Sequence, residues 1–236
     1  TKYFREEFSF EEIKKWFDDL MEEYGKWATF QCEMKNQRQA SIKELDFPYE
    51  YRPGQKKLVS DVYRTIMRQK LLFMQAPTGV GKTISTIFPA VKAVGEELAD
   101  RIFYLTAKTI TATVAKETFA LLEKNGYRAK TIQITAKEKL CPCDEMECNP
   151  VTCPYAKGHF DRVNDAVFDL LHRCEMIERD DILSQADRYT VCPFELCLDT
   201  ASWCDNIICD YNYVFDPNVY LKRFFQEGIK GDYIFL

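Results

Sequence analysis

The eight residues Ala76–Thr83 (A-P-T-G-V-G-K-T) constrain the fold of this chain more than any other stretch. They follow a short apolar run, Leu71–Met74, and precede a helical pattern. A strand, a glycine-rich loop and a helix in that order are typical of a phosphate-binding P-loop. Gly79 and Gly81 can adopt backbone angles that turn successive N–H groups toward phosphate oxygens. The positive end of the helix dipole would add to the attraction, so the stretch predicts nucleotide binding.

Each polar residue of this loop has an expected role. Lys82 would reach the outer phosphates, and the Thr83 hydroxyl would ligate magnesium, so both are candidate catalytic residues. Ala76 stands where the full GxxxxGK[ST] pattern has its first glycine. The alternative is a glycine turn in a βα unit that matches the motif by chance, but the strand–loop–helix context favours the P-loop. The predicted nucleotide contacts from the loop are Thr78, Gly79, Val80, Gly81, Lys82 and Thr83.

Length and composition describe a water-soluble globular protein. The 236 residues can bury a sizeable core, and 46% of them are hydrophobic. No apolar run approaches the ~20 residues that a membrane span requires, so no membrane partner is expected. The ten cysteines could form disulfides, but a P-loop favours a reducing cytoplasm, where clustered cysteines more often hold metal.

The formal net charge of −5 is unevenly distributed along the chain. Residues 47–95 hold eight Lys and Arg against two acids, and residues 101–140 hold eight against three. Residues 141–236 hold eight against eighteen. The basic surface is therefore concentrated around the P-loop and the segment after it, which favours a nucleic-acid partner despite the acidic total. A solvated charged surface is the alternative.

Hydrophobic periodicity predicts an α/β protein behind an N-terminal helical segment. Residues 9–45 are expected to form one long helix or two in tandem, with a Ser9–Glu12 capping box and an aromatic face that packs. That face contains Phe10, Ile13, Trp16, Phe17, Leu20, Tyr24 and Trp27. Further helices are predicted over 55–67, 83–94, 109–125 and 219–226, and strands over 71–74, 101–106, 131–135, 206–209 and 233–236. Pro89 should kink or shorten its helix.

Strands that alternate with helices at this spacing predict a parallel sheet. The alternation breaks at Lys139, where a cysteine-dense insertion with helices near 161–172 and 180–187 runs to about Trp203. The expected domains are an N-terminal helical extension (1–46), the first part of the α/β domain (47–138), the insertion (139–203) and the continuation of the α/β domain (204–236).

The insertion carries a candidate metal centre. Cys141, Cys148, Cys153 and Cys192 are separated by six, four and thirty-eight residues, and paired C-x-x-C knuckles typical of zinc sites are absent. An iron–sulfur cube tolerates such loose spacing better than a single zinc ion does. Cys143 competes with Cys141 for one ligand position, and Cys174 is a weaker candidate. Core positions are expected for Cys197, Cys204 and Cys209.

Several segments resemble the amino-terminal part of the XPD/DinG-like iron–sulfur superfamily 2 DNA helicases, the bacterial members above all. Together they cover the chain from Phe47 to Leu236 almost continuously. The resemblance implies a RecA-like sheet with a P-loop, interrupted by a small, mostly helical four-cysteine iron–sulfur domain. The segments that carry it are Phe47–Gln55, Ala76–Thr83, Tyr104–Thr109, Lys139–Tyr155, Val191–Phe194 and Asp210–Pro217.

The resemblance also implies roles for individual residues and partners for the protein. Gln55 would recognise adenine, and Thr106 and Lys108 would contact the backbone of single-stranded DNA. Cys141, Cys148, Cys153 and Cys192 would hold a 4Fe–4S cluster, with ATP and Mg²⁺ as the other cofactors.

The full-length protein is then expected to be an ATP-dependent helicase that unwinds forked DNA 5′→3′ in repair or replication. A nuclease domain would precede this chain, and a DEAH motif and a second helicase domain would follow Leu236, so the piece alone should not turn over ATP. Two alternatives stay open. One is a regulatory P-loop NTPase with a zinc-stabilised insertion, and the other is a non-enzymatic nucleic-acid-binding module.

Overall fold

The computed structural model describes residues 3–77, 79–229 and 231–236, and its centre is a five-stranded sheet. The strand order is β3-β2-β4-β1-β5, and every neighbouring pair is parallel. This confirms the predicted α/β class with a parallel sheet and agrees with a RecA-like helicase domain. The strands are β1 Arg101–Thr106, β2 Thr131–Gln133, β3 Met176–Ile177, β4 Asn206–Asp210 and β5 Tyr233–Phe235.

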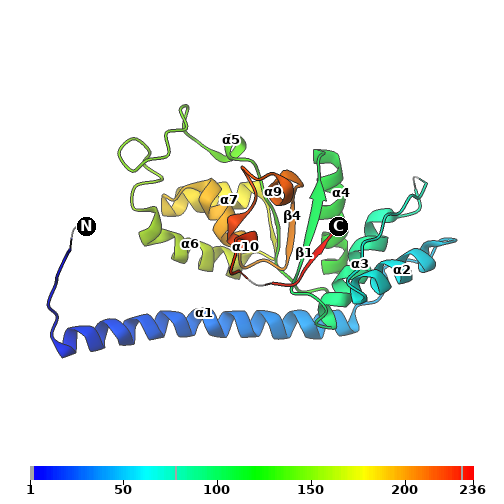
Figure 1. Cartoon of the computed structure of the whole chain (residues 1–236), viewed down its shortest axis with the longest axis horizontal. Coiled ribbons are helices and arrows are strands. Elements are labelled where there is room, and N and C mark those ends of the chain that lie inside the picture. The colour runs from blue at the N-terminus through cyan, green and yellow to red at the C-terminus, as the bar shows by residue number, and fades with distance from the viewer. Residues whose placement is uncertain (1–2, 78, 230) are drawn as a thin grey trace.

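Helices cover both faces of this sheet (Figure 1). Consecutive side chains of a strand point to opposite faces, so Ile102 packs with the helices of one layer and Phe103 with those of the other. The first layer contains α2 Gln55–Met67, α3 Lys82–Gly95 and α4 Thr109–Lys124. The second layer contains α6 His159–Arg173, α7 Arg179–Tyr189 and α8 Pro193–Ala201. Three single-turn helices are α5 Lys137–Leu140, α9 Asn212–Phe215 and α10 Lys222–Phe225.

The N-terminal segment is one continuous helix, α1 Phe10–Glu44. The predicted capping box is confirmed, because the Glu12 N–H donates to Ser9 Oγ (3.3 Å) and the Ser9 N–H donates to the Glu12 carboxylate (2.8 Å). The C-terminal half of α1 packs on the body through Ile42 and Leu45, which are almost fully buried.

The N-terminal half of α1 projects beyond α6 (Figure 1). Trp27 packs between Phe168 and Trp203, with ring centroids 5.0 and 4.3 Å away. The rest of the aromatic face is exposed, so the expected packing is confirmed at Trp27, and the body does not cover the other six residues: Phe10, Ile13, Trp16, Phe17, Leu20 and Tyr24. These residues have the helical periodicity of a buried face, but the body does not extend far enough along the helix to cover them.

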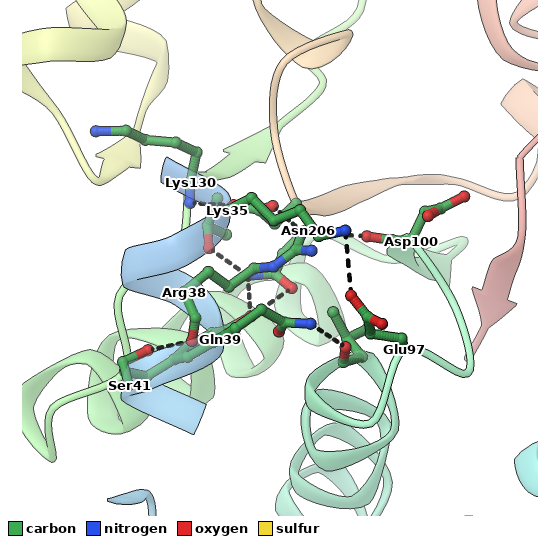
Figure 2. Close-up of polar contacts among 12 residues, drawn as sticks. Lys35, Arg38, Gln39, Ser41, Glu97, Asp100, Lys130 and Asn206 are labelled. Carbon is green, nitrogen blue, oxygen red and sulfur yellow. Dashed lines mark hydrogen bonds and ion pairs between the residues drawn. The ribbon is translucent and has the colours of Figure 1, made fainter. Parts of the chain in front are cut away.

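Polar contacts fix α1 across the amino ends of the strands, and Figure 2 shows them in close-up. The Arg38 guanidinium pairs with Asp205, which precedes β4, and donates to the carbonyl of Asp100, which precedes β1 (3.3 Å). The Gln39 amide donates to the Val94 carbonyl at the end of α3 (3.2 Å). The helix therefore bridges the sheet and one helical layer.

Two predicted elements differ from the structure. Residues 71–74 form no strand, and Leu71 and Phe73 are 86% and 92% exposed. The apolar run lacks a neighbouring ladder, and a strand needs a partner for its backbone hydrogen bonds. The helix predicted over 219–226 is only the single turn α10. By contrast, the helix predicted over 83–94 is confirmed as α3, and Pro89 does not shorten it.

The helices of the cysteine-dense insertion share the core of the sheet. Within residues 139–203, β3 pairs with β2, and neither β3 nor α8 is predicted from the sequence. Leu170 of α6 and Leu196 of α8 belong to the same buried cluster as Ile132 and Ile207 of the sheet. Three cysteines were expected in the core, and the structure confirms this, because all three are buried: Cys197, Cys204 and Cys209. None of the helices in the described ranges combines the length and apolar character needed to traverse a bilayer.

Candidate functional site

The P-loop glycines adopt the conformation that the motif requires. Gly79 and Gly81 have φ of +85° and +77°, in the left-handed region that side chains disfavour. Gly81 is the N-cap of α3, and a Cβ on it would lie 2.6 Å from the side-chain nitrogen of Gln55. The backbone conformation therefore favours glycine at 81, and a side chain there would displace the Gln55 amide. Thr78, a predicted nucleotide contact, lies outside the described residues.

Gln55 lies against the P-loop although it precedes Gly81 by 26 positions in the sequence. It is the first residue of α2 and is 4% exposed, and its Oε1 accepts a hydrogen bond from the Arg52 N–H (3.0 Å). The Arg52 guanidinium in turn donates to the Gly79 carbonyl. The start of α2 and the P-loop thus form one polar unit.

Lys82 and Thr83 occupy the first turn of α3, and Val80 is half-buried in the loop before them. The Lys82 ammonium donates to the carbonyls of Ala76 (3.1 Å) and Pro77 (2.9 Å), which places it at the mouth of the loop. These neutral acceptors can be exchanged for phosphate oxygens, which form stronger, charge-assisted hydrogen bonds. Thr83 lies beside Tyr104 of β1, where burial raises the pKa of the phenol and the Thr83 hydroxyl opposes that rise.

A groove of about 430 Å³ lies at the carboxyl ends of β1, β2 and β4. The structure brings together here the two predicted DNA contacts, Thr106 and Lys108, and three cations that the sequence did not single out. Those cations are Lys116, Lys139 and Arg179. Two of them lie in the basic 101–140 segment, so its charge excess was the available signal.

The cations of the groove differ in whether they already form ion pairs or hydrogen bonds with other residues of the protein. Lys116 forms an ion pair with Glu178 (3.1 Å), and the Arg179 guanidinium donates to the Lys139 carbonyl (3.2 and 3.0 Å). Lys108 and Lys139 make no ion pair with any residue that the structure describes. These two ammonium groups are therefore the ones most available to phosphates.

The five cysteines of the candidate metal centre share one neighbourhood. Cys148 raises the pKa of the Lys137 ammonium, and Cys192 and Cys141 add to the effect. Partial burial and then the neighbouring thiols of Cys153 and Cys141 raise the pKa of Cys143 to about 11. Three predicted ligands therefore lie close enough to Lys137 to shift its pKa, and the fourth, Cys153, lies close enough to Cys143 to do the same there.

This neighbourhood fits a soft metal centre in its donor chemistry, because thiols are the ligands that iron–sulfur clusters and zinc prefer. In residues 3–77, 79–229 and 231–236, however, no three His, Cys, Asp or Glu side chains are arranged so as to hold a metal ion. Cys143 lies between Cys141 and Cys153, so the choice between Cys143 and Cys141 as ligand stays open.

Comparison with known protein families brings in independent evidence. A family model, DEAD_2, matches residues 113–227, just under half of the chain, and this domain is found in XPD/Rad3-type helicases. The match supports a helicase superfamily. No curated protein matches the chain. A helicase domain implies the use of ATP and Mg²⁺ and a function related to nucleic acids. The matched range contains the four predicted cysteine ligands but not the P-loop, so the two signals come from different residues.

Proposed function

We propose that this chain is the ATP-binding part of a DNA helicase that works on single-stranded and forked DNA in repair or replication. One observation carries the proposal most directly. Gln55 lies against the P-loop glycine Gly81, so a buried amide and a phosphate cradle occupy one site. An amide can recognise a base by hydrogen bonds while the loop holds the phosphates. The DEAD_2 match supports the helicase class.

In this proposal the residues of the loop bind and orient the nucleotide. The N–H groups that follow Gly79 and Gly81 hold phosphate oxygens, and Lys82 neutralises the outer phosphates. The Thr83 hydroxyl would hold Mg²⁺, and the ion would offset the negative charge of the phosphates. Gln55 turns its amide from Gly81 to the adenine. Catalysis of phosphoryl transfer depends mainly on such positioning and electrostatic stabilisation.

The DNA strand would lie along the groove at the carboxyl ends of the strands. Thr106, Lys108 and Lys139 would contact its phosphates, since two of these are cations without an ion pair among the described residues. Such contacts are independent of base sequence and strongly dependent on salt. The direction of unwinding that the resemblance implies is 5′→3′.

The cysteine centre would hold a 4Fe–4S cluster through Cys141, Cys148, Cys153 and Cys192. The cluster would supply a cross-link that closes the loop from Cys141 to Cys192, with no electron transfer required. The loop 141–158 has no regular secondary structure in its described residues, so such a cross-link would stabilise it strongly. The proximity of three of these cysteines to Lys137, and of Cys153 and Cys141 to Cys143, supports this part of the proposal.

The nucleotide site is tested by titrating ATP and GTP, each with Mg²⁺, into the wild-type protein and three variants by calorimetry. Lys82→Ala should weaken both nucleotides by about 10- to 100-fold, since it removes charge-assisted hydrogen bonds of roughly 1.5–3 kcal/mol. Gln55→Ala should mainly reduce the preference for ATP over GTP. Lys57→Ala, an exposed charge change on α2, is the control. Equal affinities for wild type and Lys82→Ala would contradict the assignment.

A further inference from the structure

Arg162, in the first turn of α6, holds together the two chain segments that carry Cys153 and Cys192. Its Nε donates to the Tyr189 carbonyl (2.8 Å), and its Nη2 donates to the carbonyls of Thr190 and Lys157 (both 2.7 Å). The Lys157 N–H donates back to the Cys153 carbonyl (3.2 Å). One guanidinium thus links the turn that begins at Cys153 to the residues directly before Cys192.

His159, three residues earlier on the same helix, contacts Cys192 itself. The Cys192 N–H donates to Nδ1 of His159 at 3.2 Å, and the imidazole is 4% exposed. A ring nitrogen that accepts from an N–H carries no proton, so the proton of this neutral imidazole is on Nε2. Nε2 lies 3.8 Å from Asp199 Oδ2 of α8. The ring of His159 in α6 therefore lies beside two residues of the α8 segment, the N-cap Cys192 and Asp199, which are about two helical turns apart.

Two residues next to the Arg162 guanidinium, Gly158 and Thr190, have left-handed backbone conformations that accommodate its contacts. Gly158 has φ +66°, and a Cβ on it would lie 2.6 Å from Nη1 of Arg162. A side chain at position 158 would therefore displace the guanidinium from its present place. Thr190 has φ +52°, a left-handed conformation that is strained for a β-branched residue and persists only where its surroundings enforce it. The bond from Arg162 to the Thr190 carbonyl is such a constraint.

We propose that Gly158, His159 and Arg162 form a latch that holds Cys192 beside the other thiols before any metal binds. The inference rests on the proposed role of Cys192 as a ligand. Because the latch uses hydrogen bonds of the protein alone, it acts equally for an iron–sulfur cluster or a zinc ion. It lowers the conformational entropy lost when the metal is bound, as preorganisation does in binding sites generally. His159 and Arg162 are thus positioning residues.

The test measures how fast the Cys192 thiol of the metal-free protein is alkylated, by mass spectrometry, in three variants. His159→Asn keeps an acceptor oxygen close to the place of Nδ1, whereas His159→Gln moves its polar groups to the place of Nε2. Wild type and His159→Asn should react at the same rate. His159→Gln and Arg162→Lys should react about tenfold faster, the effect of losing one typical hydrogen bond.

The chain provides a matched control, because its second histidine lies on the same helix. His172, in the last turn of α6, contacts the Phe168 carbonyl through Nδ1 (2.7 Å), so His172→Asn should leave the Cys192 rate unchanged. Equal rates for His159→Gln, Arg162→Lys and wild type would overturn the latch.

A second measurement covers the case in which a variant fails to fold. Hydrogen exchange of the Cys192 amide in the metal-free wild-type protein should be slow, and exchange as fast as in the loop 141–158 would overturn the latch. Cobalt(II) titration separates the two proposals. If the latch variants speed up alkylation without weakening cobalt binding, the latch is supported and Cys192 fails as a ligand.

Discussion

The guanidinium of Arg38 in α1 forms a buried ion pair with the carboxylate of Asp205, directly before β4. The other oxygen of Asp205 accepts the Lys130 N–H (2.8 Å), which belongs to the approach to β2. Burial raises the pKa of Asp205, and the charge of Arg38 opposes that rise. Three segments far apart in the sequence are therefore joined at one carboxylate, and the N-terminal helix is an integral part of the fold.

We expect Arg38→Met to destabilise the protein by about 3–5 kcal/mol, because it leaves the Asp205 carboxylate buried without its counter-ion. Urea unfolding measures the loss. Lys35→Met, which removes the exposed ion pair with Glu97, should change stability by no more than about 0.5 kcal/mol. The double variant Arg38→Met/Asp205→Leu should be more stable than Arg38→Met alone. Purely additive losses would show that the two residues are not coupled.

Single-stranded DNA should bind to the groove at the carboxyl ends of the strands, and its affinity should fall steeply with salt. Lys108→Ala and Lys139→Ala should each weaken binding for all base sequences alike. Each should also lower the slope of log affinity against log salt by roughly 0.7, the value for one phosphate contact on a single strand. Lys26→Ala, on the projecting half of α1 and paired with Glu23, is the control. Fluorescence anisotropy at several salt concentrations measures all four proteins, and salt-independent binding would point to another surface.

Replacing any one of Cys141, Cys148, Cys153 and Cys192 with serine should empty the metal centre, because a hydroxyl is a hard and mostly protonated ligand. Iron and acid-labile sulfide, measured anaerobically, should be lost together with the brown colour. The P-loop sheet should survive while the loop 141–158 loosens.

The control substitutions are Cys143→Ser, Cys197→Ser and Cys204→Ser, which should keep their iron. If Cys143→Ser empties the site and Cys141→Ser does not, the ligand choice is wrong and the cluster stands. If all variants instead bind one zinc ion, the helicase assignment loses support and the zinc-stabilised NTPase gains it.

Stability should fall in alkali through the buried core thiols. Burial raises the pKa of the Cys197 thiol from its ordinary value near 9 to about 11. The folded state therefore keeps a proton that the unfolded state releases, so stability is full below about pH 9 and is lost as the pH rises toward 11. Between pH 9 and 11, Cys197 should lower the free energy of unfolding by roughly 1.4 kcal/mol for each pH unit.

The comparison that isolates this effect is urea unfolding at pH 8–11 under reducing conditions. The free energy of unfolding of Cys197→Ala should fall less steeply with pH than that of wild type, by roughly 1.4 kcal/mol per pH unit. Cys32→Ala, which changes an exposed thiol on α1, should follow wild type. Parallel curves for wild type and Cys197→Ala would rule out a role for this thiol in the alkaline loss.

Local features of this protein could be predicted from the sequence because neighbouring residues decide them. The Ser9–Glu12 box that begins α1 depends on contacts within one turn of helix. The strand Arg101–Thr106 follows from its own run of apolar residues. The left-handed Gly81 follows from the P-loop motif, since only glycine adopts that conformation easily.

Tertiary structure decided what depends on residues distant in the chain. Leu71–Met74 has the composition of a strand, but it lacks a neighbouring ladder and is exposed. Leu20 and Ile42 lie on the same periodic face of α1, yet the body covers only Ile42. Periodicity reports which side of an element is apolar, whereas burial also requires a surface that reaches it.

The candidate sites divide in the same way. Lys82 and the cysteines are predicted as site residues from the sequence, because residue type and spacing carry their chemistry. The sequence did not predict the contact of Gln55 with Gly81. It also did not predict the hydrogen bonds that link His159 and Arg162 to the Cys192 segment. These contacts join residues that are distant in the sequence. Which distant residues meet is decided by the packing of the whole core around the sheet.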